Sequence, residues 1–188
     1  FLFNSMNIIA SLIAVDQDAA ETAVEDLSAL FRASLSEATQ VPFEQELELC
    51  RGYARIEQQR LGDRLTMAWR VDDVPCGLMI PSLSLQPLLE NAIYHGIQHR
   101  PEGGLVAIDA SYRDGLMTVT VSNPLPAASR GSEGNHMAHH NIHHRLQALY
   151  GNSAGLSIEQ DDHQYRATIQ YPVPCDDATK ELAEVQQA

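Results

Sequence analysis

Five histidines lie within a short stretch in the C-terminal third of the chain, at positions 136, 139, 140, 143 and 144. On a helix, His139 and His143 share one face and so do His140 and His144, because residues four apart lie one turn apart. This is the spacing of zinc ligands, but a structural zinc site needs four ligands and no cysteine lies nearby. An electrostatic hypothesis is also open: imidazoles titrate near pH 6.5, so the cluster would attract phosphate in mild acid.

The composition limits the classes of partner. The chain has 188 residues, 44% of them hydrophobic, and a formal net charge of −13, which predicts a folded domain of ordinary size. The negative charge argues against non-specific nucleic-acid binding and against an anionic membrane surface. Three scattered cysteines without a C-x-x-C pair indicate a reducing compartment. No run reaches the roughly 20 apolar residues of a membrane span.

The N-terminal residues predict a helical hairpin. Apolar residues recur at helical spacing over 8–13, and a capping box of Asp18 and Glu21 is expected to open a second helix. A second copy in a homodimer is expected to cover the apolar stripe of this hairpin. The run from Phe1 lacks the basic start of a signal peptide and opens within a helical pattern, which indicates a piece of something longer. Its acidic side chains are expected to form a solvated face: Asp16, Asp18, Glu21, Glu25 and Asp26.

The remaining elements predict the fold class. After a break over 38–42, the expected order is helix, strand, helix, two strands, helix and two strands, with the strands mostly antiparallel. Helices on one face of such a sheet form an α+β two-layer sandwich. The expected ranges are helices at 43–61, 83–98 and 138–150, and strands at 65–71, 105–112, 116–121, 155–160 and 165–171. An acidic tail is expected to follow.

Several short motifs carry a resemblance to a known family. Residues 85–96 read LQPLLENAIYHG, which resembles the asparagine box of sensor histidine kinases, and of their LytS/AlgZ branch in particular. The opening FLFNSMN resembles the end of that branch's phosphoacceptor motif. The sequence from Phe1 to Leu35 looks closest to its AlgZ-type members. Further matches in the family's order are FRASL at 31–35, VPFEQELE at 41–48 and QRLGDRL at 59–65.

The resemblance implies a division of the chain. Residues 1–40 would be the helical dimerisation and phosphotransfer region, and 41–175 the ATP-binding domain of the Bergerat fold shared with gyrase and Hsp90. Residues 176–188 would be the acidic tail. The phosphoacceptor His would be the residue just before Phe1, so this stretch alone is not expected to phosphorylate itself there. Membrane-spanning helices would lie upstream, which makes this the cytoplasmic portion of an inner-membrane protein.

The resemblance also implies roles for residues near the asparagine box. Asn91 would be the Mg²⁺ ligand, since Mg²⁺ takes hard oxygen ligands, and Glu90 would position a water or the acceptor His. His95 would pack near the adenine of ATP, although a solvent-facing histidine at a helix end is an equally plain alternative. Tyr94 stands where relatives often carry a basic residue.

Two nucleotide-binding boxes depart from the family pattern. Asn123 takes the position of the Asp that accepts from the adenine amino group, and prolines replace the glycines after it. In the phosphate-binding loop only Gly134 remains of three glycines, whereas Asn141 and Arg145 still match the helix that follows. Backbone N–H groups of such a loop normally cradle phosphates, so the departures predict weakened nucleotide binding.

The resemblance implies one function and leaves two alternatives. The expected function is histidine kinase activity in two-component signalling: the γ-phosphoryl of ATP, bound with Mg²⁺, passes to a His and then to a LytTR-type response regulator. Cofactor contacts are expected from His95, Asn123, Gly134, Asn141 and Arg145. The first alternative is a pseudokinase that acts as a phosphatase or sequesters the regulator. The second is a zinc-responsive regulatory domain built on the histidine cluster.

Overall fold

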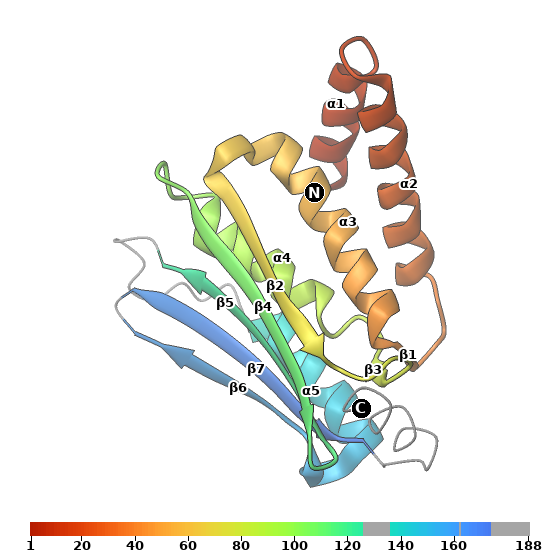
Figure 1. Cartoon of the computed structure of the whole chain (residues 1–188), viewed down its shortest axis with the longest axis vertical. Coiled ribbons are helices and arrows are strands. Elements are labelled where there is room, and N and C mark those ends of the chain that lie inside the picture. The colour runs from red at the N-terminus through yellow and green to blue at the C-terminus, as the bar shows by residue number, and fades with distance from the viewer. Residues whose placement is uncertain (126–135, 162, 174–188) are drawn as a thin grey trace, which may run out of the picture.

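The structure is a computed structural model that describes residues 1–125, 136–161 and 163–173, and for 136–138 the backbone only. Two antiparallel helices form the predicted hairpin, α1 (Leu2–Leu12) and α2 (Gln17–Ser34), which projects from the rest of the molecule (Figure 1). The predicted capping box is wrong by two residues. Asp16, not Asp18, caps α2, because its side chain accepts a hydrogen bond from the N–H of Ala19 at 3.0 Å.

Helix α3 (Phe43–Leu61) has the bounds that the sequence predicts. It runs between the hairpin and the sheet, so it is apolar on two sides and buries residues from Phe43 to Leu61. Gly62 ends it with a φ of +58°, a left-handed conformation that glycine adopts at little cost. A short 3₁₀ turn, η1 (Gly62–Arg64), leads into the sheet.

A single twisted sheet forms the second layer. Its strands are β2 (Leu65–Asp73), β4 (Gly104–Arg113), β5 (Leu116–Pro124), β6 (Gly155–Gln160) and β7 (Gln164–Pro172), in the order β2-β4-β5-β7-β6. Only β2 and β4 pair in parallel; the other described pairs are antiparallel. The hairpin between β4 and β5 turns at Asp114 and Gly115, both with positive φ, as the sequence predicts.

Two features of the chain were not predicted. The expected break at 38–42 forms a short strand, β1 (Gln40–Pro42), which pairs with β3 (Met79–Pro81). The expected helix at 83–98 is α4 (Gln86–Asn91) followed by a π-helical stretch, η2 (Ala92–Ile97). In η2 the N–H of Gln98 bonds to the carbonyl of Ile93, five residues back, at 3.0 Å. Wide turns of this kind are frequent at functional sites.

Helices α3, α4 with η2, and α5 (His136–Tyr150) cover one face of the sheet (Figure 1). A second 3₁₀ turn, η4 (Gly151–Ser153), follows α5. The core lies between these helices and the sheet, and its fully buried side chains include Ile93, Ile108, Leu146 and Ile169. The two-layer α+β sandwich is therefore confirmed. The predicted tail lies outside the described residues.

Candidate active site

Helix α4, which carries the asparagine box, begins at a loop held by a buried carboxylate. Glu46 of α3 is fully buried and accepts hydrogen bonds from the N–H groups of Leu83 and Leu85, the latter at 3.2 Å. Leu83 has a φ of +53°, a conformation that costs free energy for a residue with a side chain. Burial raises the pKa of Glu46, although these N–H groups oppose the shift. Glu46 thus acts as the missing N-cap of α4.

Arg145 of α5 holds the same loop from the other side. Its Nη1 donates to the carbonyl oxygens of Ser82 at 2.6 Å and Leu83 at 3.1 Å. Glu46 thus takes the N–H groups of the loop while Arg145 takes its carbonyls. The predicted contact of Arg145 with nucleotide stays a prediction, and in this structure its guanidinium links α5 to the start of α4.

Glu90 lies at the end of α4 in a partly buried position. Its carboxylate accepts a hydrogen bond from Nε2 of Gln86 at 2.9 Å. Burial raises the pKa of Glu90 and the charge of Glu57 adds to this, whereas the hydrogen bond from Gln86 opposes it. The nitrogen of Phe1 lies within electrostatic range of this carboxylate, so the start of α1 is near the end of α4.

Phe1 is held against α3 by an aromatic contact. Its ring packs against that of Tyr53 on α3, with centroids 4.8 Å apart. Tyr53 is buried, and burial together with the charges of Glu57 and Glu90 raises the pKa of its phenol. Glu57 is itself buried and paired with Arg60 through Nε at 2.9 Å. The start of α1 therefore packs on the middle of α3, within electrostatic range of Glu90 at the end of α4.

Two asparagines present buried polar atoms with no hydrogen-bond partner among the described residues, Nδ2 of Asn91 and Oδ1 of Asn123. Asn123 ends β5, is buried, and donates through Nδ2 to the carbonyl of Pro124 at 2.9 Å. Because Nδ2 is engaged there, Oδ1 is left as an acceptor. Unpaired buried polar atoms are costly, so both mark positions where a bound polar ligand would lower the free energy.

Gly96 allows η2 to lie directly on Asn123. A Cβ at this position would meet Nδ2 of Asn123 at 2.2 Å and the carbonyl of Pro124 at 2.9 Å. The structure therefore brings the asparagine box and the end of β5 together, as the resemblance implies. Sequence analysis did not identify Gly96 as a determinant of this contact.

His95 is partly exposed at the other side of η2. Burial, with the neighbouring His99, lowers the pKa of its imidazole. Tyr94 is exposed, and its ring lies edge-on to His95 at 4.8 Å and to His99 at 5.6 Å. A neutral His95 edge-packed by an aromatic ring is compatible with the predicted position beside a nucleotide base.

The α5 side of the site is only partly described. Gly134 lies outside the described residues, and Asn141 is exposed on α5. Oδ1 of Asn123 is an acceptor that the described residues offer to a base. The predicted contacts of Gly134 and Asn141 with nucleotide stay predictions.

The histidine cluster does not assemble a structural zinc site in the part of the chain that the structure describes. No group of three or more His, Cys, Asp or Glu residues there is placed to hold a metal ion. His139 bonds through Nε2 to the hydroxyl of Tyr165 at 2.9 Å, and His140 to Nε2 of His144 at 2.9 Å. The four-ligand zinc site therefore finds no support here.

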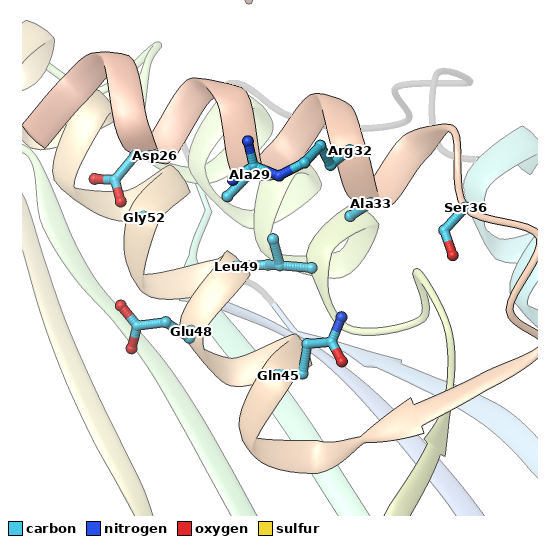
Figure 2. Close-up of a pocket in the computed structure, with 9 residues that line it drawn as sticks. All are labelled: Asp26, Ala29, Arg32, Ala33, Ser36, Gln45, Glu48, Leu49 and Gly52. Atoms are coloured by element: carbon cyan, nitrogen blue, oxygen red, sulfur yellow. The ribbon is translucent and has the colours of Figure 1, made fainter.

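A surface cavity of about 370 Å³ lies between α2 and α3 (Figure 2). At one end Asp26 of α2 lies against Gly52 of α3, where a Cβ would meet its Oδ1 at 2.8 Å. Asp26 is buried and binds Arg55 in a bidentate ion pair with distances of 2.6 and 2.9 Å. The expectation that Asp26 belongs to the solvated acidic face is therefore wrong, because it joins the hairpin to α3.

Glu46 was not among the residues predicted from the sequence, although its position on an apolar helix face marks it as unusual. Glu46 lies among Phe43, Leu47 and Cys50, on the apolar side of α3. A carboxylate on a buried helix face has to find donors, because an unpaired buried charge is very costly. Which donors it finds depends on the approach of the loop at 83–85, which sequence spacing does not reveal.

Comparisons with known proteins find histidine kinases. A sequence model of the family described as histidine kinase matches residues 1–65. The sensor protein LytS of Oceanobacillus iheyensis is 32% identical over 86% of this chain and 30% of its own length. The sensor histidine kinase YpdA of Escherichia coli is 36% identical over 85% of this chain and 30% of its own length. The chain thus spans about 30% of the length of these relatives.

Solved structures show the same fold. The Acinetobacter baumannii histidine kinase AdeS has a TM-score of 0.54 at 13% identity, with 87% of this chain and 83% of that chain covered. The catalytic domain of histidine kinase ThkA has a TM-score of 0.53 at 14% identity, with 73% and 97% covered. Full-length ShkA in complex with AMPPNP has a TM-score of 0.50 at 19% identity, with 87% and 38% covered. Among the described helices none is both long and apolar enough to cross a bilayer.

Proposed function

The chain is a relative of the LytS-type sensor histidine kinases, and from this premise we propose that it is the phosphotransfer and ATP-binding part of such a kinase. Its reaction moves the γ-phosphoryl group of ATP to a histidine and from there to an aspartate of a response regulator. The packing of Phe1 on Tyr53, within electrostatic range of Glu90, carries this proposal, because the resemblance puts the phosphoacceptor His directly before Phe1.

Glu90 then has a defined chemical role. An imidazole that attacks the γ-phosphorus forms an N–P bond, breaks the bond to the bridging oxygen of ADP, and loses its ring proton. A partly buried carboxylate with a raised pKa is a better proton acceptor than an exposed one. Glu90 accepts that proton, and Gln86 orients the carboxylate through its bond to Oε1 at 2.9 Å. Tyr53 positions α1 by packing against Phe1.

Asn123 and Asn91 are assigned to the cofactors on different grounds, Asn123 by its unpaired Oδ1 and Asn91 by its place in the asparagine box. Oδ1 of Asn123 accepts a hydrogen bond from the amino group of adenine, since its Nδ2 is already engaged with Pro124. Asn91 supplies a hard oxygen ligand of the kind that Mg²⁺ prefers. Bound Mg²⁺ would neutralise charge on the phosphates during transfer. In support, the fold shared with ShkA holds the ATP analogue AMPPNP in that protein.

The partners follow from the same premise. The hairpin exposes large apolar side chains, among them Phe3, Met6 and Ile13, and a second copy of the hairpin in a homodimer covers them. A LytTR-type response regulator receives the phosphoryl group. Membrane-spanning helices precede this stretch in the longer protein, which places it on the cytoplasmic side of an inner membrane. The AlgZ-type affinity of the opening residues stays a prediction.

A pseudokinase is the second candidate, favoured by the replaced glycines around Gly134 and by Asn in place of Asp at position 123. Such a protein keeps the fold and the dimer but binds no nucleotide. It acts on the regulator as a phosphatase or by sequestering it. Nucleotide binding separates the two candidates directly.

The test is calorimetric titration of the chain with ATP and Mg²⁺. We expect binding that Asn91→Ala weakens at least tenfold. Asn152→Ala, which replaces an exposed asparagine in η4, is the matched control and leaves affinity unchanged. Binding that Asn91→Ala leaves intact contradicts the assigned site, and absence of binding to the unaltered chain favours the pseudokinase.

A further inference from the structure

The imidazoles of His140 and His144, one helical turn apart on α5, are in contact. Both side chains are exposed, their ring centroids are 4.1 Å apart, and the rings are nearly perpendicular at 85°. The two Nε2 atoms lie 2.9 Å apart, within hydrogen-bond distance. Of two neutral imidazoles so placed, one Nε2 carries the proton and the other accepts it.

We propose that His140 and His144 are a bidentate site for a divalent transition metal of the Cu²⁺ or Ni²⁺ type. Histidine nitrogens bind such ions at roughly 2.0–2.1 Å, so two ligands at a right angle lie about 2.9 Å apart, whereas tetrahedral ligands lie about 3.4 Å apart. The separation of 2.9 Å matches the right angle of square-planar or octahedral coordination. This geometry fits Cu²⁺ and Ni²⁺ better than tetrahedral Zn²⁺.

The neighbouring histidines indicate why the site has two protein ligands. His139 directs its Nε2 to the hydroxyl of Tyr165 at 2.9 Å. His143 is adjacent to His144 in the chain, so on a helix its side chain leaves the axis about 100° away from that of His144, and their ring centroids are 6.4 Å apart. Water completes the coordination of the metal, so the site is open and exchanges readily. The formal charge of −13 favours a cation near the surface.

Metal binding here acts on α5 as a whole. An ion held by residues four apart bridges one helical turn and stabilises it. Arg145 follows this turn directly, and its guanidinium bonds to the carbonyls of Ser82 and Leu83 in the loop before α4. Occupancy of the pair therefore braces the helix that contacts the loop before the asparagine box.

The test uses the chain without an affinity tag, freed of metal by a chelator, and titrated calorimetrically with Cu²⁺ and separately with Ni²⁺. We expect His140→Gln and His144→Gln each to weaken binding at least tenfold. His143→Gln is the matched control, since it removes an exposed histidine of the same helix, and it changes affinity less than threefold. Equal losses in all three variants overturn the assignment to this pair, as does binding that none of them weakens.

A second measurement reports the ligands themselves. The electron paramagnetic resonance spectrum of the Cu²⁺ complex is expected to show two equivalent imidazole nitrogens, reduced to one in His140→Gln. Circular dichroism of the metal-free variants shows whether α5 persists, so a lost ligand is distinguished from a lost helix. A spectrum without imidazole nitrogens overturns the proposal. Metal binding at this pair does not depend on the nucleotide site, so Asn91→Ala is expected to bind the metal normally.

Discussion

The two helical segments that flank the candidate site differ in how firmly the fold holds them. Along α4 and η2, Leu88, Leu89, Ile93 and Ile97 are almost completely buried. On α5, the buried side chains over 139–150 are Ile142 and Leu146, and most others face solvent. The segment with Glu90 and Asn91 is thus part of the core, whereas α5 is held by Ile142 and Leu146, by Arg145, and by ring contacts at its two ends. The structure therefore holds the asparagine box more firmly than the residues of α5 that were expected to contact nucleotide, Asn141 and Arg145.

Truncation of one isoleucine in each segment tests this contrast most strongly. Ile93→Ala is expected to lower the free energy of unfolding by about 4 kcal/mol, and Ile142→Ala by about 2 kcal/mol, because a helix open to solvent relaxes around a cavity more easily. Ile158→Ala, which truncates an exposed isoleucine of β6, is the control and costs little. Urea unfolding measures all three. Equal losses for Ile93 and Ile142 would show that α5 is held as firmly as η2.

The loop before α4 is held by Glu46 of α3 on one side and by Arg145 of α5 on the other, so the strength of the two supports can be compared. Glu46→Ala removes the acceptor of two backbone N–H groups and is expected to cost about 3 kcal/mol. Arg145→Ala frees carbonyls that water can reach and is expected to cost about 1 kcal/mol. Glu46→Gln retains an acceptor oxygen and recovers part of the loss. Thermal unfolding of the three variants checks the order, and a larger loss for Arg145→Ala would reverse the comparison.

The contact of η2 with β5 is expected to leave no room for a side chain larger than glycine at position 96. Gly96→Ala places a methyl group 2.2 Å from Nδ2 of Asn123, so the side chain or η2 has to shift. Overpacking of this kind costs about 2 kcal/mol, and the displaced Asn123 also weakens ATP binding in calorimetry. Gly155→Ala, which meets nothing within 4 Å, serves as the control. Unchanged ATP affinity in Gly96→Ala would contradict the proposed hydrogen bond between Asn123 and adenine.

The smallest expected effect is the pH dependence that Glu90 contributes. Its pKa is raised in the folded state from 4.5, so the folded chain holds this proton more tightly than the unfolded chain. Stability from Glu90 is therefore complete below pH 4.5 and is lost as pH rises through the folded pKa. Glu90→Gln lacks this loss, so its stability relative to the unaltered chain rises above pH 4.5. Urea unfolding between pH 4 and 8 measures the difference, and a constant difference would contradict the raised pKa.

Much of the fold follows from local pattern. Apolar periodicity predicted α3 and β6 with their observed bounds, and Asp114 with Gly115 predicted the turn of the central hairpin. Two failures have long-range causes. The strand β1 forms because β3 pairs with it across some forty residues, and Asp26 is buried because Arg55 meets it from α3. Neither partner is visible in the residues adjacent to these positions.

The candidate site divides in the same way. The resemblance to the family implied Glu90, Asn91 and Asn123, because the motif that carries it is continuous or follows a predictable strand. Glu46, Gly96 and the role of Arg145 came from the tertiary structure, because each acts on a loop or strand distant in sequence. The sequence determines its own helices, strands and motifs through local spacing. The packing of α3, α4 and α5 on one sheet decides which polar atoms are satisfied and which are left for a ligand.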